Sequence, residues 1–114
     1  MSILIILNGS PYGSERSYNG LRLAKALASK DTDVAVFLLA DAVVCAKRGQ
    51  KVPQGFYSIE LMLKSVMRKG EVLLCGTCMD ARGIRDDEII EGAQRSTMPE
   101  LAEHTLTADK VLVF

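Results

Sequence analysis

Apolar runs alternate along the chain with segments whose apolar residues recur at helical spacing. The runs at 3–7, 34–39, 72–74 and 109–114 predict strands, because each is short and bounded by turn-forming or charged residues. The helical pattern predicts helices over about 14–30, 41–47, 58–66, 85–91 and 97–106. Strands that alternate with helices pair in parallel through right-handed crossovers, so the predicted fold class is α/β, a three-layer α/β/α sandwich with a mainly parallel sheet of about four to five strands. With 114 residues the chain is long enough for one hydrophobic core, and residues 1–114 are expected to form a single domain.

Polar residues mark the starts of several of these helices. A Ser, Thr or Asp side chain at a helix start can accept a hydrogen bond from a free backbone N–H of the first turn. The starts predicted in this way lie at Ser14, Asp41, Ser58 and Thr97. The segment 48–55 has the composition of a loop without regular structure. The charges of Arg48 and Lys51 in this loop could guide an anionic substrate or partner, or could simply be solvated.

Charge and composition exclude several classes of function. Fourteen basic and fourteen acidic residues give a formal net charge of zero, which provides no general attraction to DNA, RNA or an anionic membrane. The first apolar run, Ile3–Leu7, has no basic leader and is too short for a signal peptide or a membrane span. We therefore expect a cytoplasmic protein with no nucleic acid and no membrane as partner. A sheet this small leaves edges and faces uncovered, so a homo-oligomer is expected.

The three cysteines are the main candidates for chemistry. An odd number in a reducing compartment argues against a disulfide framework. A structural metal site at the C-x-x-C pair Cys75 and Cys78 would need further ligands, for which only Cys45 and His104 are available, so no metal is expected. A thioredoxin-type couple would lie early in a βαβ pattern, whereas this pair follows the third predicted strand. Cys45 is interpreted as an inert core residue and His104 as a surface residue.

The position of the cysteine pair points to chemistry on sulfur. Cys75 and Cys78 come directly after the run 72–74, at the expected carboxyl end of a buried strand. Ligand binding and reactions in open α/β sheets occur at this edge. Arg82 and Arg85 follow within a few residues, and positive charge lowers the pKa of a thiol and so favours the reactive thiolate. Cys75 is therefore predicted to be a nucleophile or carrier, with Cys78 assisting and Arg82 favouring the thiolate.

The loop 8–14 joins the first predicted strand to the first predicted helix. Free backbone N–H groups in such a loop can hold an anion, but the sequence matches neither the dinucleotide-binding nor the P-loop pattern, so no cofactor is expected. We interpret the loop as lining a pocket around the thiols. The pocket candidates are Asn8, Gly9, Tyr12 and Asp41, although a tight turn explains Asn8 and Tyr12 nearly as well.

Six short motifs stand in order along the chain. They are Asn8–Glu15, Leu21–Ala24, Asp41–Val43, Arg48–Lys51, the Cys75–Cys78 pair with Arg82-Gly83, and the final Ala108–Phe114. Each motif is short and unspecific alone. Together, over nearly the whole chain, they resemble the DsrE/DsrF-like family, and most closely its YchN-type members.

The resemblance implies a parallel α/β/α domain, assembled as a hexamer or a trimer. It also implies that sulfur is passed as a cysteine persulfide between donor and acceptor proteins. In the sulfur-relay members, the sulfur-bearing cysteine stands at the end of the third strand, seven residues before the Arg of an Arg-Gly pair, and Cys75 has this position relative to Arg82. Cys78 departs from that pattern, and a second thiol so close could turn a persulfide into a disulfide and release sulfide.

Three functions follow from these observations. The leading hypothesis is a sulfur-relay protein that binds or transfers sulfane sulfur as a persulfide, as a sulfurtransferase or as a carrier. The first alternative is a thiol oxidoreductase that uses the Cys75/Cys78 pair. The second is a non-catalytic ligand-binding or assembly module, which a buried and unreactive Cys75 would favour.

Overall fold

Five parallel strands form one sheet, in the order β4-β3-β2-β1-β5. The computed structural model describes residues 1–114. The strands are β1 (Ser2–Leu7), β2 (Asp33–Leu38), β3 (Glu71–Cys75), β4 (Gln94–Ser96) and β5 (Lys110–Val113). The helices are α1 (Arg16–Ala28), α2 (Ile59–Met67), α3 (Gly76–Ala81) and α4 (Met98–Thr107), with 3-10 helices η1 (Ala40–Ala46) and η2 (Asp86–Glu88). The predicted α/β class is confirmed.

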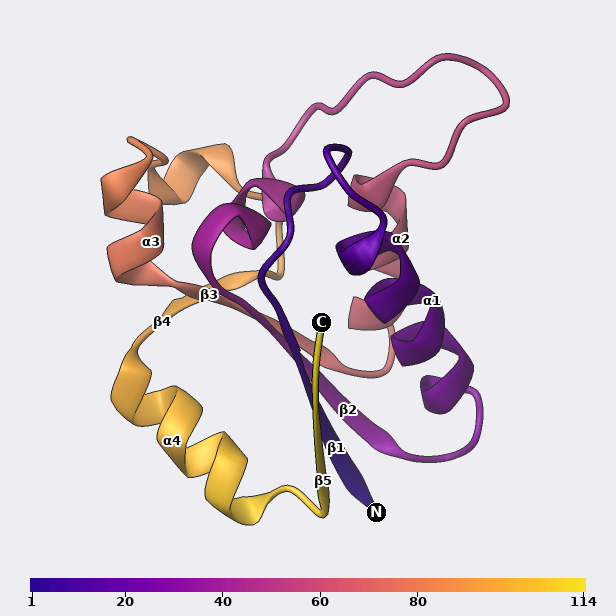
Figure 1. Ribbon diagram of the computed structural model, residues 1–114, viewed down its shortest axis with the longest axis vertical. Coiled ribbons are helices and arrows are strands. Elements are labelled where there is room, and N and C mark those ends of the chain that lie inside the picture. The colour runs from indigo at the N-terminus through magenta and orange to yellow at the C-terminus, as the bar shows by residue number, and fades with distance from the viewer.

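Helices cover both faces of the sheet, as Figure 1 shows. Helices α1 and α2 lie on one face and α4 on the other, while α3 and η1 lie beyond the carboxyl ends of the strands. Gly20 allows α1 to approach the sheet closely, because a β-carbon at this position would overlap Leu7 and the ring of Phe114. Helix α1 has 13 residues, and no helix is long and apolar enough to cross a bilayer.

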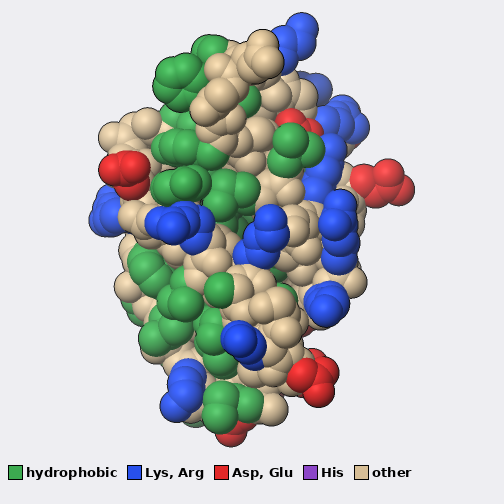
Figure 2. All heavy atoms as spheres, turned by 90° about the vertical axis from the view of Figure 1, so that its right-hand side faces the viewer, with side chains coloured by type: hydrophobic (Ala, Val, Ile, Leu, Met, Phe, Trp, Pro, Cys, Tyr) green, Lys and Arg blue, Asp and Glu red, His purple; other side chains and the backbone are tan.

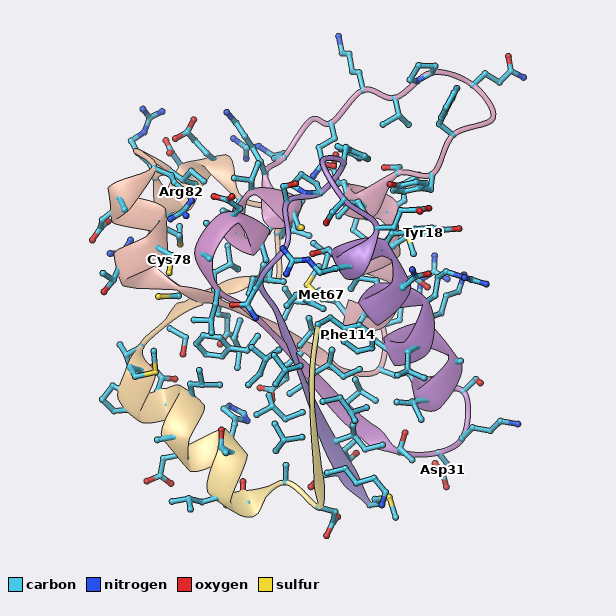
Figure 3. All side chains as sticks on the ribbon, in the orientation of Figure 1. Tyr18, Asp31, Met67, Cys78, Arg82 and Phe114 are labelled. Atoms are coloured by element: carbon cyan, nitrogen blue, oxygen red, sulfur yellow. The ribbon has the colours of Figure 1, made fainter.

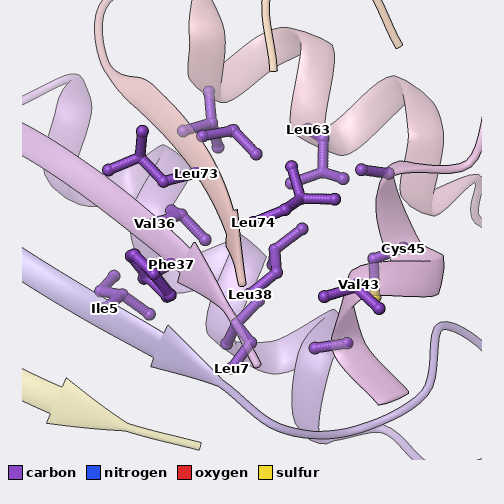
Figure 4. Packing of buried hydrophobic residues seen from close by; sticks show 14 of the residues in the cluster. Ile5, Leu7, Val36, Phe37, Leu38, Val43, Cys45, Leu63, Leu73 and Leu74 are labelled. Carbon is purple, nitrogen blue, oxygen red and sulfur yellow. The ribbon is translucent and has the colours of Figure 1, made fainter. Parts of the chain in front are cut away.

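The strand register separates the core into two halves. Leu7 faces α1, and its registered neighbours Leu38 and Leu74 face the same side, where they pack with α2 (Figure 4). Because successive side chains of a strand alternate between faces, Leu73 and Cys75 point to the opposite side, the side of α4. The central strands are thus buried on both faces, which explains why their sequences are continuously apolar.

Two predicted helix caps are confirmed. Ser58 Oγ accepts a hydrogen bond from the N–H of Leu61, and Thr97 Oγ1 accepts one from the N–H of Glu100. Each satisfies one of the backbone donors left free at the start of its helix. The loop after η1 has no regular elements, as predicted for 48–55.

The other two predicted caps are wrong. Helix α1 begins one residue later than Ser14 requires, with Glu15 at its cap and no side-chain cap hydrogen bond. The segment after β2 is a 3-10 helix capped by Leu39, and Asp41 lies in its first turn, where its carboxylate is bound by an arginine. In both cases tertiary contacts decide where the chain turns.

Two short elements near the cysteines were not predicted. Helix α3 begins directly after Cys75 and contains Cys78, and the polar segment Gln94–Ser96 forms the edge strand β4. The helix expected over 85–91 is only the single 3-10 turn Asp86–Glu88. These elements are too short to show a hydrophobic period, and β4 exists because β3 supplies its hydrogen-bond partners.

Candidate functional site

Cys75 occupies the junction between strand β3 and helix α3. It is the last residue of the strand and the N-cap of the helix, where its sulfur accepts a hydrogen bond from the N–H of Cys78 at 3.4 Å. The junction lies at the carboxyl edge of the sheet, as the sequence predicts (Figure 1). Both thiols are free.

The Cys75 thiol is buried, which is the feature expected of a non-catalytic module and not of the predicted nucleophile. The residue is 6% exposed, since its side chain points into the layer under α4. Burial raises the pKa of the Cys75 thiol above its ordinary value, and hydrogen bonding with the Cys78 thiol raises it further, although the backbone N–H groups of Cys78 and Thr77 act in the opposite direction. The predicted lowering of this pKa by neighbouring arginines is therefore wrong. Desolvation outweighs the charges because the guanidinium groups are engaged elsewhere.

Cys78 is the more accessible thiol of the pair. It is partly exposed, and its sulfur accepts a hydrogen bond from the backbone N–H of Ala40 at 3.2 Å. Such an N–H stabilises negative charge that develops on sulfur during a reaction. Ala40 itself has a φ of 51°, a left-handed conformation that costs a non-glycine residue about 1–2 kcal/mol. The fold thus holds a strained turn whose N–H points at Cys78, and such strain is concentrated at functional sites.

Arg82 links helix α3, which contains Cys78, to the turn at Ala40 that contacts this cysteine. Its guanidinium donates to the carboxylate of Asp41 at 2.8 and 3.0 Å and to the carbonyl oxygen of Cys78 at 3.1 Å. Figure 3 shows Arg82, the C-cap residue of α3, on the same side of the molecule as Cys78 within that helix. The arginine therefore fixes α3 against η1 and keeps Ala40 beside Cys78, which is a different role from the predicted contact with a Cys75 thiolate. Arg85 points away and pairs with Asp87 at 3.1 Å on the surface.

Strand β4 contributes two residues that the sequence did not indicate. Arg95 lies over Gly76, so that a β-carbon there would come within 2.8 Å of Arg95 Nε. Its guanidinium pairs with Asp80 at 2.7 Å and Asp86 at 3.4 Å. Ser96 is paired in register with Cys75 and is 2% exposed. No apolar pattern marks this polar strand, so only the backbone pairing reveals both residues.

Of the four pocket candidates, only Asp41 is linked to the Cys75/Cys78 pair, through Arg82. The amide of Asn8 donates to the carbonyl oxygen of Phe114 at 3.3 Å, and so ties the end of β1 to the chain terminus. The carbonyl oxygen of Gly9 accepts a hydrogen bond from Ser17. Tyr12 accepts a hydrogen bond from the N–H of Ile59, at the start of α2. The loop 8–14 therefore packs on α1 and α2 and does not line the thiol pair.

Cys45 is an inert core residue, as predicted. Its side chain is fully buried under the loop 8–14, beside Ser17 (Figure 4). Desolvation raises the pKa of Cys45 to about 12. Burial and the raised pKa both disfavour this thiol as a nucleophile at neutral pH.

His104 lies at the opposite edge of the sheet. Together with Asp33 and Glu71, it lines a cavity of about 320 Å³ at the amino ends of the strands, away from the carboxyl edge that carries Cys75. His104 is therefore not a base for the thiols. No group of three or more His, Cys, Asp or Glu side chains is arranged to hold a metal ion.

An aromatic stack marks the outer side of α1 and α2. Tyr57 stacks on Tyr18 with ring centroids 4.0 Å apart, Tyr12 lies 5.7 Å from Tyr57, and Arg22 lies over Tyr18. Apolar side chains gather along this face between lysines and arginines (Figure 2). Phe56, 70% exposed, adds to the uncovered apolar area.

Comparison with known proteins gives a consistent family assignment. The model of the DsrE/DsrF-like family matches residues 1–114. Protein YchN of Escherichia coli K12 is 47% identical over 115 residues, covering 98% of this chain and 97% of that protein. An uncharacterized protein of Methanocaldococcus jannaschii is 33% identical over 114 residues and covers both chains fully. The crystal structure of E. coli ychN superposes with a TM-score of 0.95 at 46% identity, covering 100% of this chain and 99% of that one. A protein of unknown function from Methanobacterium thermoautotrophicum has the same fold, with a TM-score of 0.80 at 10% identity over 99% and 98% of the two chains.

Proposed function

The chain belongs to the DsrE/DsrF-like family, and on this basis we propose that it binds and transfers sulfane sulfur as a persulfide on the Cys75/Cys78 pair. The observation that carries the proposal is the hydrogen bond from the strained Ala40 to Cys78. It directs a backbone N–H at a partly exposed sulfur, with a second thiol one helical turn away. We place this activity in the cytoplasm, where thiols remain reduced.

Cys78 is the thiol that a sulfur donor meets first. Its thiolate attacks the outer sulfur of a donor persulfide, RS–SH. A bond forms between Cys78 and the outer sulfur, the S–S bond of the donor breaks, and RS⁻ leaves with the bonding electrons. The N–H of Ala40 stabilises the charge on Cys78 before the attack. This assigns the loading step to Cys78 and not to Cys75, which the sequence had favoured.

Cys75 has the position of a second, internal thiol. It is buried, its pKa is raised, and it lies against Cys78. A thiol that stays protonated at neutral pH attacks slowly, so a persulfide on Cys78 persists long enough to meet an acceptor protein. When no acceptor arrives, Cys75 can attack Cys78 and discharge the sulfur as hydrogen sulfide.

The test is persulfide loading of single-cysteine variants. Protein with Cys45→Ala is treated with glutathione persulfide, and the added sulfur is located by mass spectrometry. We expect Cys78→Ser to abolish loading. We expect Cys75→Ser to load as the parent does, with a longer-lived adduct because the discharging thiol is missing. Loading on Cys75 alone would overturn this assignment, and loading on neither cysteine would overturn the sulfur-relay function.

A thiol oxidoreductase is the alternative that the contact between the two thiols favours. An oxidoreductase needs both cysteines, whereas a carrier needs only one. If each single substitution eliminates reduction of a disulfide substrate, and neither variant ever carries persulfide, the redox function replaces the carrier.

We also propose that the protein acts as a homo-oligomer, with a hexamer or a trimer indicated by the family. Strand β5 is an edge strand with Val113 64% exposed, and α2 exposes Leu61. Open edges and uncovered apolar side chains of this kind are commonly buried between subunits. Light scattering at micromolar concentration is the test, and a monomer would contradict the proposal.

A further inference from the structure

Ser96 places a buried hydroxyl without a partner in the core of the site. The residue is 2% exposed, and Ser96 Oγ is the one buried side-chain polar atom that lacks a hydrogen bond. Buried hydroxyl groups in native proteins are nearly always paired, because an unpaired one loses its hydration without compensation. This exception calls for a functional explanation.

The strand register directs Ser96 toward the buried thiol. Ser96 is the registered partner of Cys75, each being the last residue of its strand. Neighbouring strands are about 4.8 Å apart, and paired residues of a parallel sheet project from the same face. The side chains of Ser96 and Cys75 therefore project from the same face of neighbouring strands, the face covered by α4.

The chemical states of the thiol explain why the hydroxyl is unpaired here. A neutral thiol is a weak acceptor of hydrogen bonds, whereas a thiolate is a strong one. The backbone N–H of Cys78 donates to the Cys75 sulfur at 3.4 Å, and the backbone N–H of Thr77 also favours the charged form of this thiol. The guanidinium groups of the neighbouring elements already form ion pairs. Arg82, at the end of α3, pairs with Asp41. Arg95 of β4 pairs with Asp80 and Asp86. Beyond the Cys78 thiol and the two backbone N–H groups, Ser96 is thus the uncommitted side-chain donor on the same face for a charge on the Cys75 sulfur.

We propose that Ser96 is a positioning residue for the internal thiol, and that its Oγ–H donates a hydrogen bond to the Cys75 sulfur whenever this sulfur carries negative charge. The role of Ser96 in catalysis rests on the proposed function, in which Cys75 discharges the persulfide of Cys78. In that step a bond forms between the two cysteine sulfurs, and the bond from Cys78 to the outer sulfur breaks. The outer sulfur leaves with the bonding electrons and takes up the proton of Cys75, so the products are a disulfide and hydrogen sulfide. The sulfane sulfur is reduced while the two cysteines are oxidised.

The test is a titration of Cys75 that involves no persulfide. In a background with Cys45→Ala and Cys78→Ser, Cys75 is the only cysteine, and the NMR shift of its ¹³C-labelled β-carbon reports thiolate formation in the folded protein. A hydrogen bond to a charged group corresponds to about one to two pH units, so Ser96→Ala should raise the midpoint by that amount and lower the thiolate fraction at a fixed alkaline pH about tenfold or more. Ser96→Thr keeps the hydroxyl and should leave the midpoint near that of the parent.

Stability separates this role from a structural one. Ser96→Ala removes an unpaired buried hydroxyl, so its urea midpoint should equal or exceed that of the parent. An unchanged titration midpoint in folded Ser96→Ala overturns the proposal, whatever its stability. If Ser96→Thr does not fold, the comparison of Ser96→Ala with the parent decides alone. Persulfide loading is measured separately, in the Cys45→Ala protein that keeps Cys75 and Cys78. An unchanged titration midpoint together with normal loading of that protein refutes only the role of Ser96. A shifted midpoint together with no loading of that protein refutes only the sulfur-relay function.

Discussion

The three cysteines should react with iodoacetamide in a defined order, Cys78 first, Cys75 later and Cys45 last. Only the thiolate alkylates, so the rate follows the thiolate fraction and the access of the reagent. The pKa of Cys45 is about 12, compared with 9.0 for an ordinary thiol. Each pH unit is a factor of ten, so at neutral pH Cys45 has about a thousandfold less thiolate than an ordinary thiol.

Pulse labelling near neutral pH measures this order directly. A brief pulse of light iodoacetamide, followed by unfolding in urea and a chase with the heavy isotope, gives the labelled fraction of each cysteine by mass spectrometry. We expect Cys75 between the other two, because its burial slows the reaction and its pKa is raised. As a control, the three thiols should label at similar rates in urea, where no fold distinguishes them.

Comparable labelling of Cys45 and Cys78 in the folded protein would refute the reasoning. It would mean that the loop 8–14 opens often enough to expose Cys45 to solvent. A faster reaction at Cys75 than at Cys78 would contradict the assignment of the accessible thiol, and would return the loading step to Cys75.

The remaining predictions concern stability. The urea midpoint should fall as pH rises from 9.0 toward about 12, because unfolding lets the thiol of Cys45 lose the proton that the fold retains, and Cys45→Ala should reduce this slope. Glu60→Ala should destabilise the protein by about 2 kcal/mol, because the buried carboxylate accepts hydrogen bonds from the N–H groups of Gly49 and Gln50. The amide hydrogens of these two residues should then exchange faster with solvent. Glu60→Gln should show a smaller effect. The same hydrogen bonds outweigh burial and lower the pKa of Glu60, so the stability that they supply should be lost in acid, as pH falls below 4.5. Asp31→Gly should stabilise the protein by up to about 1 kcal/mol, measured as a higher thermal midpoint, because Asp31 has a φ of 61° in the turn after α1. Thiol labelling should not change, because Asp31 lies far from Cys78 (Figure 3).

The sequence predicts the fold wherever an element buries enough apolar surface to show a period. Strands β1, β2 and β3 and helices α1, α2 and α4 have such patterns, and the predicted boundaries agree within about two residues. Strand β4 has no pattern, because its three polar residues are held by pairing with β3. The edge of the sheet that carries the thiols also follows from the sequence, since parallel strands bring their carboxyl ends together.

The roles within the site do not follow from the sequence in the same way. Cys75 looks exposed because it follows the apolar run 72–74, and its burial depends on the neighbouring strand β4, which leaves no sequence signal. In the sequence, the positive charge of Arg82 is near enough to stabilise a thiolate. In the structure, the carboxylate of Asp41, which is distant in the chain, binds this guanidinium. The donor at Ala40 is invisible because alanine gives no hint of a left-handed conformation.

The main-chain origin of the hydrogen bond to Cys78 has a consequence for how the site can vary among related proteins. No change of side chain at position 40 deletes this N–H except proline, whose fixed negative φ is incompatible with the turn. Glycine and asparagine adopt this conformation at low cost, whereas valine and isoleucine do not. Two backbone hydrogen bonds of the preceding residue hold the turn. The N–H of Leu39 donates to the carbonyl oxygen of Leu7, and the carbonyl oxygen of Leu39 accepts from the N–H of Ala42. We therefore expect position 40 to vary among small residues in related proteins without loss of the N–H that donates to Cys78.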